Sequence, residues 1–385
     1  MRSTLAGALA ASLVATASLA APAETLPPAS HFLFWTPAEQ LVGYRNIEKI
    51  FPTRVVKRGP ITTPLPRATA PFDVSYVDGG EQLNVDRFME KHRVSGLIIV
   101  QHGRVLLERY GLGRKETDRW TSFSVAKSVT STLIGAAIKD GYISGLDAPV
   151  TRYLPQLAGG GYDGVTVGDL ITMRSGVKWN EDYVDPKSDV NQFAFQPRTE
   201  PGVDPIETYM AKLPRAHPPG TVFHYDTGET DLAGLLVARA TRKPLADYLS
   251  EKIWTRIGAE QDAVWMLDQA GMELGGCCLS MTLRDYARFG LFFLRGGEGV
   301  LPEGWVKDAS TAHVPTGNPG EGYGYFWWID SRGTYAAEGI FGQMIYLDPK
   351  RDLVVVVNSA WSQADDPADW RSLAAFTTAV SRTVP

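Results

Sequence analysis

Runs of hydrophobic residues near the two ends of the chain predict strands. "SGLIIVQHGRVLLERYG", starting at residue 95, predicts two strands joined by a His-Gly turn. Near the other end, "GYGYFWWID", "TYAAEGIF", "QMIYLD" and "LVVVVNSA" are rich in β-branched and aromatic residues, and "DPKRD" predicts the turn between the last two. We therefore expect strands from both ends of the chain.

The middle of the chain carries a helical pattern. After Thr121, the side chains of Leu133, Ala137 and Ile138 share one helix face, and Gly141 is typical of a helix end. Two more helices are predicted by "TDLAGLLVARATRKPLADYLSEKIW", and a final amphipathic helix by "PADWRSLAAFTTAVSRTV". This order predicts an α+β fold: an antiparallel sheet built from both chain ends, flanked by helices, with an inserted, mostly helical subdomain. A site is expected at their junction.

The first 23 residues are typical of a secretory signal peptide. One Arg is followed by a short Ala/Leu/Val run and then small residues, and cleavage is expected after Ala20 or Ala23. The alternative is a short buried or amphipathic helix. No other segment is apolar enough to cross a bilayer. We therefore expect a bacterial protein that is periplasmic or secreted, without stable membrane insertion after cleavage.

Two regions follow the signal peptide. Residues 24–75 are rich in Pro and are expected to form an irregular N-terminal extension, within which residues 31–52 could form a helix that packs on the body. Residues 76–385 are expected to form the main domain, with 121–275 as its mostly helical part.

Composition excludes several classes of partner. The chain has 385 residues, 44% of them hydrophobic, with a formal net charge of −5 and a pI near 5.8. This length is enough to bury a large core. No block of five or more Lys/Arg occurs, so neither nucleic acid nor an anionic membrane surface is expected as a partner. The oligomeric state is left open.

Cysteine usage indicates neither a disulfide framework nor a metal site. The only cysteines, Cys277 and Cys278, are adjacent, and neighbouring cysteines rarely bond to each other. We expect them to be small buried apolar side chains, with a catalytic cysteine as the alternative. No metal or cofactor is expected.

A Ser-x-x-Lys pattern occurs twice, at Ser124 with Lys127 and at Ser175 with Lys178. A serine hydroxyl needs an adjacent base to act as a nucleophile, and lysine is a base only when neutral. Serine at a helix N-terminus with lysine one turn later meets this need, because the side chains share a face. The helix dipole and burial both favour the neutral amine. The serine N–H is also free to bind an oxyanion.

Only the first pair is predicted to lie at the start of a helix. Helical sequence follows Ser124, and Thr121 and Ser122 are candidate N-caps. Ser175 follows a helical segment and precedes Gly176, which is typical of a helix end. We therefore take the first pair as candidate nucleophile and base, and the second as a chance occurrence. The alternative for the first pair is a capping serine beside a solvated lysine.

Tyr225 is the candidate proton shuttle. In "PPGTVFHYDTGETDLAGLL" a turn and a short extended run precede it, and Asp226 and Glu229 form a predicted capping box for the next helix. A phenol near Lys127 could share its proton and help to keep the lysine neutral. The alternative is a tyrosine whose ring is core. His224 is another candidate base, but strand alternation points it the other way.

Longer strings resemble a known superfamily. "FSVAKS", "HYDTGETDLAGLL" and "YLPQL" with "YDGVTVGDLITMRSGV" resemble motifs of the serine β-lactamase/penicillin-recognising superfamily in its class C-like branch, from about Phe72 to the end. "WNEDYVDPKSDV", "GWV", "WWID" and "GIFGQMIYLDPKRDLVVVV" resemble the 6-aminohexanoate-dimer hydrolases of nylon-oligomer degradation and their esterase relatives. The resemblance implies a class C β-lactamase fold and a serine hydrolase without metal or cofactor.

The resemblance also implies roles for single residues. Ser124 is the acylated nucleophile and Lys127 its general base, while Tyr225 protonates the leaving group and assists the deacylating water. The oxyanion donors are the backbone N–H groups of Ser124 and Ile340. The substrate-binding residues are Tyr183, Gly339 and Phe341. Phe341 and the pair Trp327–Trp328 indicate an apolar pocket, with one Trp in the core and the other on the surface as the alternative.

Two departures from the family pattern bear on the substrate. The Lys-Thr-Gly motif of β-lactamases is absent: Ala337, Glu338 and Gly339 stand there, and Glu338 would repel a substrate carboxylate. The nylon-oligomer enzymes have "GIHGQ" where this chain has "GIFGQ", and an Asn where it has Leu274. We expect hydrolysis of a small ester. The alternatives are a 6-aminohexanoate-oligomer-type amidase, a D-peptidase, or a non-catalytic binding or sensing domain of the same fold.

Overall fold

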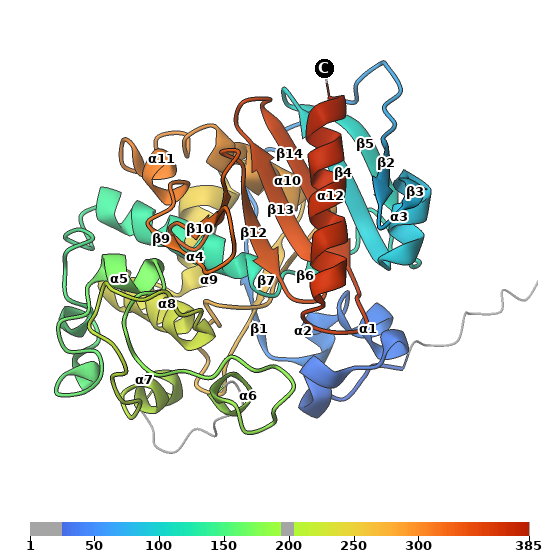
Figure 1. The fold of residues 1–385 in the computed structure, drawn as a ribbon. Coiled ribbons are helices and arrows are strands. Elements are labelled where there is room, and N and C mark those ends of the chain that lie inside the picture. Colours follow the sequence, from blue (N-terminus) through green and yellow to red (C-terminus); the bar gives the residue numbers. More distant parts are fainter. Residues whose placement is uncertain (1–24, 194–203, 385) are drawn as a thin grey trace, which may run out of the picture.

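The computed structural model describes residues 25–193 and 204–384, so the expected signal peptide lies outside the described residues. Its main sheet has eight strands in the order β5-β4-β14-β13-β12-β11-β10-β9, all antiparallel. They are β4 (Val94–Gln101), β5 (Arg104–Tyr110), β9 (Val314–Pro315), β10 (Glu321–Tyr323), β11 (Trp328–Asp330), β12 (Tyr335–Gly339), β13 (Gln343–Asp348) and β14 (Leu353–Ser359). Since β14 pairs with β4, the sheet is built from both chain ends, as expected (Figure 1).

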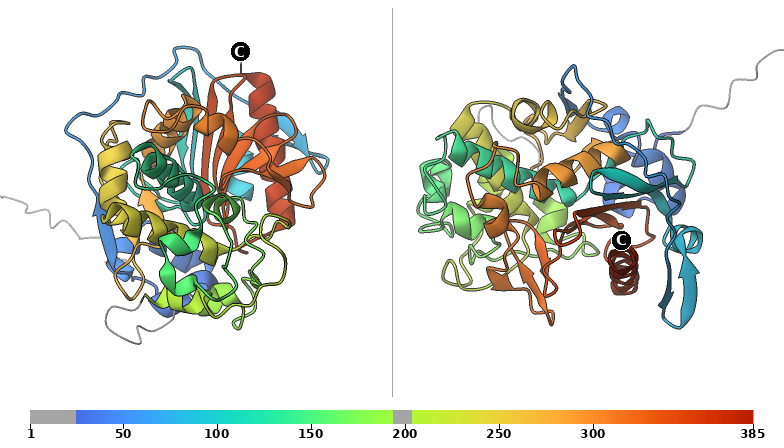
Figure 2. Two further views of the ribbon diagram at one scale, coloured as in Figure 1. Left: turned by 90° about the vertical axis from the view of Figure 1, so that its left-hand side faces the viewer. Right: turned by 90° about the horizontal axis from the view of Figure 1, so that it is seen from above.

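Both faces of this sheet are covered by helices. In β14, Val355 belongs to the hydrophobic cluster with α12 (Pro367–Thr383) and α3 (Val85–Lys91), whereas Val354 packs against α10 (Leu283–Leu294). Successive side chains of a strand point to opposite faces, which explains why "LVVVV" is hydrophobic without alternation. Figures 1 and 2 show α12 on one side of the sheet and α10 on the other.

The middle of the chain is mostly helical. Its helices and helical turns are α4 (Val125–Lys139), η2 (Val150–Arg152), η3 (Pro155–Leu157), α5 (Val167–Ile171), α6 (Asp189–Phe193), α7 (Pro205–Met210), α8 (Thr227–Thr241), α9 (Leu245–Leu249) and η4 (Ser250–Trp254). A short helix, α11 (Trp305–Ala309), precedes β9. Helix α4 contacts both α8 and β12, so it lies at the junction of the helical part and the sheet.

The N-terminal extension is more regular than its Pro content suggested. It contains η1 (Ala29–Phe34), α1 (Pro37–Gly43) and α2 (Ile47–Ile50). Helix α1 begins with a capping box in which Thr36 and Glu39 bond each other's backbone N–H. The helix expected within residues 31–52 is present as short helices, whose Phe32, Tyr44 and Ile47 belong to the core, whereas residues 57–74 are largely irregular.

Two small sheets accompany the main one. The first has the order β1-β7-β8-β6, and the second pairs β2 with β3. Their strands are β1 (Thr53–Val56), β2 (Ser75–Asp78), β3 (Glu81–Asn84), β6 (Trp120–Thr121), β7 (Ala263–Met266) and β8 (Leu279–Met281). The sequence led us to expect a single sheet, so both small sheets were missed. The first of them continues through β6 toward helix α4.

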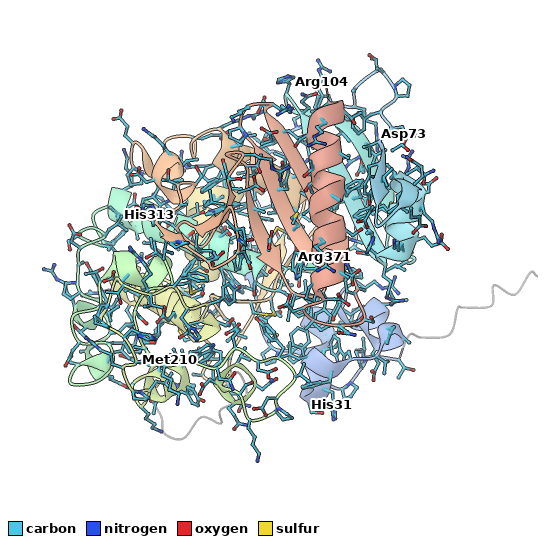
Figure 3. All side chains as sticks on the ribbon, viewed as in Figure 1. His31, Asp73, Arg104, Met210, His313 and Arg371 are labelled. Carbon is cyan, nitrogen blue, oxygen red and sulfur yellow. A yellow bond between two sulfur atoms is a disulfide. The ribbon has the colours of Figure 1, made fainter. Side chains whose placement is uncertain are left out.

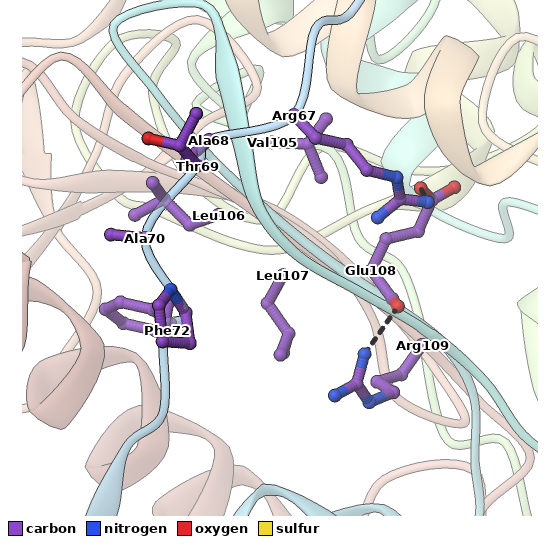
Figure 4. Close-up of a pocket in the computed structure, with 11 residues that line it drawn as sticks. Arg67, Ala68, Thr69, Ala70, Phe72, Val105, Leu106, Leu107, Glu108 and Arg109 are labelled. Atoms are coloured by element: carbon purple, nitrogen blue, oxygen red, sulfur yellow. Dashed lines mark hydrogen bonds and ion pairs between the residues drawn. The ribbon is translucent and has the colours of Figure 1, made fainter.

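The edge strand β5 is partly covered by the N-terminal extension. Its Val105 exchanges backbone hydrogen bonds with Pro66 and Ala68 over 2.8 and 2.9 Å. A cavity of about 300 Å³ lies between residues 67–72 and β5 (Figure 4). Three strands separate β5 from β12 in the sheet. Charged side chains such as Arg371 lie on the outer surface (Figure 3).

The cysteine prediction was wrong in one respect. Cys277 and Cys278 form a disulfide between adjacent residues. Cys278 has left-handed backbone, with φ of 67°, and this turn brings the two side chains together. Its side chain is fully buried, as expected.

Two features are absent from residues 25–193 and 204–384. No helix there is long and apolar enough to span a membrane. No group of three or more His, Cys, Asp or Glu side chains is arranged to hold a metal ion.

Candidate active site

Ser124 lies at the start of helix α4. It is the N-cap residue, and its side chain makes no capping hydrogen bond. The Lys127 N–H donates to the Ser124 carbonyl over 3.0 Å, so one helical turn separates the two residues. The expected caps were wrong: Thr121 belongs to β6, and Ser122 Oγ accepts from the Leu279 N–H over 3.1 Å. The Ser124 hydroxyl therefore does not cap the helix.

The turn before α4 lies against strand β12. A Cβ atom at Gly339 would be 2.6 Å from the Ser122 carbonyl oxygen and 2.9 Å from the Ser124 nitrogen, so glycine permits this approach. Gly339 thus lets β12 approach the backbone of Ser122 and Ser124 closely. Among the described residues, the N–H groups of Ser124 and Ile340 have no hydrogen-bond acceptor. Two such donors beside the nucleophile are what an oxyanion requires.

Lys127 is buried, with 1% of its surface exposed. Its Nζ donates to Thr227 Oγ1 over 2.9 Å and to the Gly276 carbonyl over 3.1 Å. Loss of water lowers the pKa of Lys127, while the charges of Glu181 and Asp231 act in the opposite direction. The buried amine can therefore act as a base, and Glu181, the strongest of the opposing charges, can stabilise the ammonium that forms.

Two residues that the sequence did not single out connect this base to a loop. Thr227, the first residue of α8, accepts from Lys127 and donates its hydroxyl proton to Glu181. Glu181 also accepts from the Thr227 N–H over 3.0 Å, from the Tyr183 hydroxyl over 2.5 Å and from the Trp179 indole. The only sequence signal for Thr227 was its place in the first turn after the tyrosine motif.

Tyr225 is half-buried beside both candidate groups. The centre of its ring lies 5.2 Å from Lys127 Nζ, and the ring stacks on Trp328 at 5.6 Å. Loss of water and the charge of Glu181 raise the pKa of Tyr225 well above its usual value, and the neighbouring Ser124 side chain lowers it to a smaller extent. The phenol is therefore protonated at neutral pH and can donate a proton to a leaving group.

Helix α8 carries three buried acidic side chains near the base. Asp226 caps the helix by accepting from the Glu229 N–H over 3.0 Å, and Asp231 accepts from the Gly276 N–H over 2.7 Å. Burial raises the pKa of Asp226 well above its usual value, that of Glu229 to about 8 and that of Asp231 to about 7. These carboxyls hold their protons at or near neutral pH, which limits the negative charge that would keep Lys127 protonated.

Two further residues lie close to Tyr225. Tyr183, the expected substrate-binding tyrosine, is half-buried, and its pKa is raised by burial and by the charges around it, Tyr225 included. Glu338 is half-buried on β12, and burial together with Glu321 and Asp365 raises its pKa to about 8. Its charge also raises the pKa of Tyr225. Glu338 can therefore influence the charge of a substrate beside the catalytic groups.

Phe341 is not placed in a pocket. Its ring is 2% exposed and lies 5.2 Å from Phe123 and 5.8 Å from Tyr44, within an aromatic cluster. The Phe341 ring is therefore part of the core packing, whereas the sequence suggested contact with a substrate. Of the two tryptophans, Trp327 is fully buried and Trp328 is half-buried against Tyr225.

The rejected candidates do not form a second site. Ser175 is 2% exposed and its Oγ accepts from the Val177 N–H over 3.0 Å, whereas Lys178 is exposed. His224 is exposed, and its Nε2 lies 2.8 Å from the Trp179 carbonyl oxygen.

Comparison with known proteins places the chain in a family. A family model described as Beta-lactamase matches residues 82–378, a range that includes Ser124, Lys127 and Tyr225. The chain belongs to the Beta-lactamase family. Members of this family are serine hydrolases that work through an acyl-enzyme, and the relatives named below are hydrolases and esterases. The enzyme class expected from the sequence is thus confirmed.

Individual relatives agree with this assignment. The 6-aminohexanoate-dimer hydrolase of Paenarthrobacter ureafaciens is 34% identical over 304 residues, which cover 73% of this chain and 76% of the relative. Esterase EstB of Burkholderia gladioli is 30% identical over 185 residues, or 42% and 45% of the two chains. A solved structure of a candidate 6-aminohexanoate-dimer hydrolase from Bacillus anthracis has a TM-score of 0.77 at 24% identity, covering 89% and 93% of the chains. This likeness confirms the expected fold class.

Proposed function

We propose that this enzyme hydrolyses small carboxylic esters through an acyl-enzyme on Ser124. The proposal is carried by one observation: a buried lysine with a lowered pKa stands one helical turn from Ser124, and its Nζ lies 5.2 Å from the centre of the Tyr225 ring. A binding or sensing domain of the same fold would not need this arrangement.

In acylation, Ser124 Oγ attacks the ester carbonyl carbon and its proton passes to the neutral Lys127 amine. The tetrahedral oxyanion accepts hydrogen bonds from the N–H groups of Ser124 and Ile340. The bond between carbon and the alcohol oxygen then breaks, and Tyr225 donates its proton to the departing alkoxide. The Lys127 ammonium restores the proton of Tyr225.

In deacylation, water attacks the acyl carbon and gives up one proton through Tyr225 to Lys127. The second oxyanion forms at the same two backbone donors. When it collapses, the bond between carbon and Ser124 Oγ breaks and the acid leaves. The serine oxygen takes the proton back from Lys127, which returns the enzyme to its starting state.

An ester is preferred to an amide because an alkoxide leaves with less help from an acid than an amine does. The residues on β12 also disfavour a β-lactam, because Ala337 supplies no cation for its carboxylate and Glu338 supplies an acidic group. We therefore propose a substrate without a carboxylate near β12.

Amide hydrolysis of 6-aminohexanoate oligomers is the second candidate. It is favoured by the 34% identity to the hydrolase named for the dimer. A D-peptidase is a weaker alternative, which cleavage of a D-Ala-D-Ala peptide would support.

We also propose that the enzyme is exported to the bacterial periplasm or secreted, supported by the pattern of residues 1–23. Fractionation of cells followed by N-terminal sequencing should find a mature chain that begins after Ala20 or Ala23. A cytosolic chain that retains its first 23 residues would contradict this part of the proposal.

The nucleophile is tested by intact-mass analysis after treatment with a fluorophosphonate. The wild type should gain one adduct, which peptide mapping places on Ser124, and Ser124→Ala should gain none. A panel of p-nitrophenyl esters, p-nitroanilides, the 6-aminohexanoate dimer and a chromogenic cephalosporin then ranks the substrate classes. A folded wild type that stays unlabelled, or a label on Ser175, contradicts the proposal.

A further inference from the structure

Two phenylalanines adjoin the two oxyanion donors. Phe123 precedes Ser124 and Phe341 follows Ile340, and both have left-handed backbone, with φ of 43° and 60°. Residues other than glycine rarely adopt this conformation and keep it only where their surroundings hold them. The direction of each donor therefore depends on how its neighbouring phenylalanine is held.

One aromatic cluster from the N-terminal extension holds both phenylalanines. Phe32 stacks on Phe123 with a centroid distance of 5.3 Å, and the edge of Tyr44 meets Phe123 at 5.1 Å. Tyr44 also reaches Phe341 at 5.8 Å, and the two phenylalanines are 5.2 Å apart. No ring of the four is more than 4% exposed.

One backbone and one side-chain hydrogen bond attach the same segment to both sides of the site. The Thr121 N–H, three residues before the nucleophile, donates to the Tyr44 carbonyl over 3.0 Å. The fully buried Gln40 donates from Nε2 to the Trp361 carbonyl over 3.0 Å. Trp361 in turn donates its N–H to the Phe341 carbonyl over 3.3 Å. Residues 29–51 thus bridge the nucleophile turn and the loop after β12.

We propose that residues 29–51 hold the oxyanion hole in its working geometry, with Phe32 and Tyr44 as positioning residues. They act through Phe123 and Phe341 to aim the two backbone donors at the same point. The inference rests on the proposed function. It adds a catalytic requirement for a segment that lies outside the range matched by the family model.

The chain offers a matched control for a merely structural role. Phe88 is 1% exposed and stacks on Phe376 at 4.0 Å, in the hydrophobic cluster with α12 on the other face of the sheet. Phe32→Leu and Phe88→Leu each remove one ring from a buried stack. Both should lower the melting temperature, but only Phe32→Leu alters the surroundings of the oxyanion donors.

The experiment compares the two variants in kcat and KM for a p-nitrophenyl ester and in Ki for phenylboronic acid. The boronic acid adds to the serine and carries a tetrahedral, negatively charged centre. Phe32→Leu should lower kcat about tenfold, keep KM within about twofold and raise Ki by a factor similar to that for kcat. Phe88→Leu should change none of the three by more than about twofold.

Phe32→Met, which better keeps the side-chain volume, replaces Phe32→Leu if the latter does not fold, and should show a smaller loss of the same kind. Unchanged kcat and Ki in a folded Phe32 variant overturn the inference and leave the proposed function standing. Equal losses in Phe88→Leu also overturn it. A wild type that hydrolyses no ester and binds no boronic acid overturns the proposed function, and this inference falls with it.

Discussion

The two faces of the main sheet bury polar groups in opposite ways. On the face of α12, His92 Nδ1 lies 2.7 Å from Asp369 Oδ1, and its Nε2 lies 2.8 Å from Ser372 Oγ, so the polar groups satisfy one another. On the face of α4, Lys127 and the acidic side chains of α8 are buried with displaced pKa values, such as that of Glu229. Paired groups join elements, whereas groups held against their preference for water are available for chemistry.

This contrast separates activity from stability. A change among the displaced groups near α4 should reduce turnover with little loss of stability, and a change under α12 should do the reverse. The expected effects below run from the largest to the smallest.

The largest effect is expected for Lys127→Ala. Without its base the serine stays protonated, so kcat for an ester should fall by about 10³-fold or more. The melting temperature should hold or rise, because a buried amine no longer has to be desolvated. Steady-state kinetics and calorimetry measure the two quantities. Lys178→Ala, in the second Ser-x-x-Lys, is the control and should retain full activity; a variant of Lys127 within tenfold of wild type would rule out its role.

A smaller loss is expected for Gly339→Ala. Its Cβ would lie 2.6 Å from the Ser122 carbonyl oxygen, so β12 or the nucleophile turn has to shift. A displacement of a few tenths of an ångström at the oxyanion donors should lower kcat about 10- to 100-fold. The control is Gly168→Ala, where the nearest atom would be 3.4 Å away and activity should be kept. If Gly339→Ala and Gly168→Ala were equally active, β12 would tolerate the added methyl group and this prediction would be wrong.

Glu338 should discriminate among substrates by charge. Its pKa of about 8 reflects burial and the nearby Glu321 and Asp365, so it becomes anionic as the pH rises through that value. Between pH 6 and 9, kcat/KM for a carboxylate-bearing ester should fall several-fold relative to that for a neutral ester. In Glu338→Gln this ratio should stay flat. A ratio that changes equally in both proteins would mean that another group sets the charge preference.

The smallest effect concerns the dependence of stability on pH. Glu229 has an ordinary pKa of 4.5 when unfolded and a pKa of about 8 when folded. Between these values the folded state binds a proton that the unfolded state releases, so the free energy of unfolding decreases as the pH rises from about 5 to about 8. Asp231 acts in the same direction. Melting temperatures should drop by a few degrees over this range, and Glu229→Gln should make the decrease shallower; an identical slope would contradict the buried, protonated state.

Contiguous motifs made the central candidates visible in the sequence. Ser124 and Lys127 belong to one helical turn, and Tyr225 directly precedes a capped helix start, so short-range rules placed them, while the resemblance to a known family was needed to choose them over their alternatives. The strands of the main sheet were predictable for a similar reason, because two-sided burial requires long hydrophobic runs.

Features that depend on distant partners could not be predicted. Thr227 meets Glu181 across 46 positions of the chain, and no local pattern records that contact. Phe341 and the two tryptophans suggested an apolar pocket, but the Phe341 ring packs in a cluster with Tyr44 from the opposite end of the chain. The disulfide at Cys278 was missed because a left-handed turn is not visible in the residue types.

The pairing of β4 with β14 also sets when the enzyme can first work during its synthesis. Ile99 of β4 lies opposite Val355 of β14, so β4 is synthesised long before the strand with which it pairs. The nucleophile leaves the ribosome long before β12 brings Ile340 beside it. A nascent chain therefore presents Ser124 without the neighbouring Ile340, together with an uncovered strand edge. The proposed site forms only once the chain is almost complete.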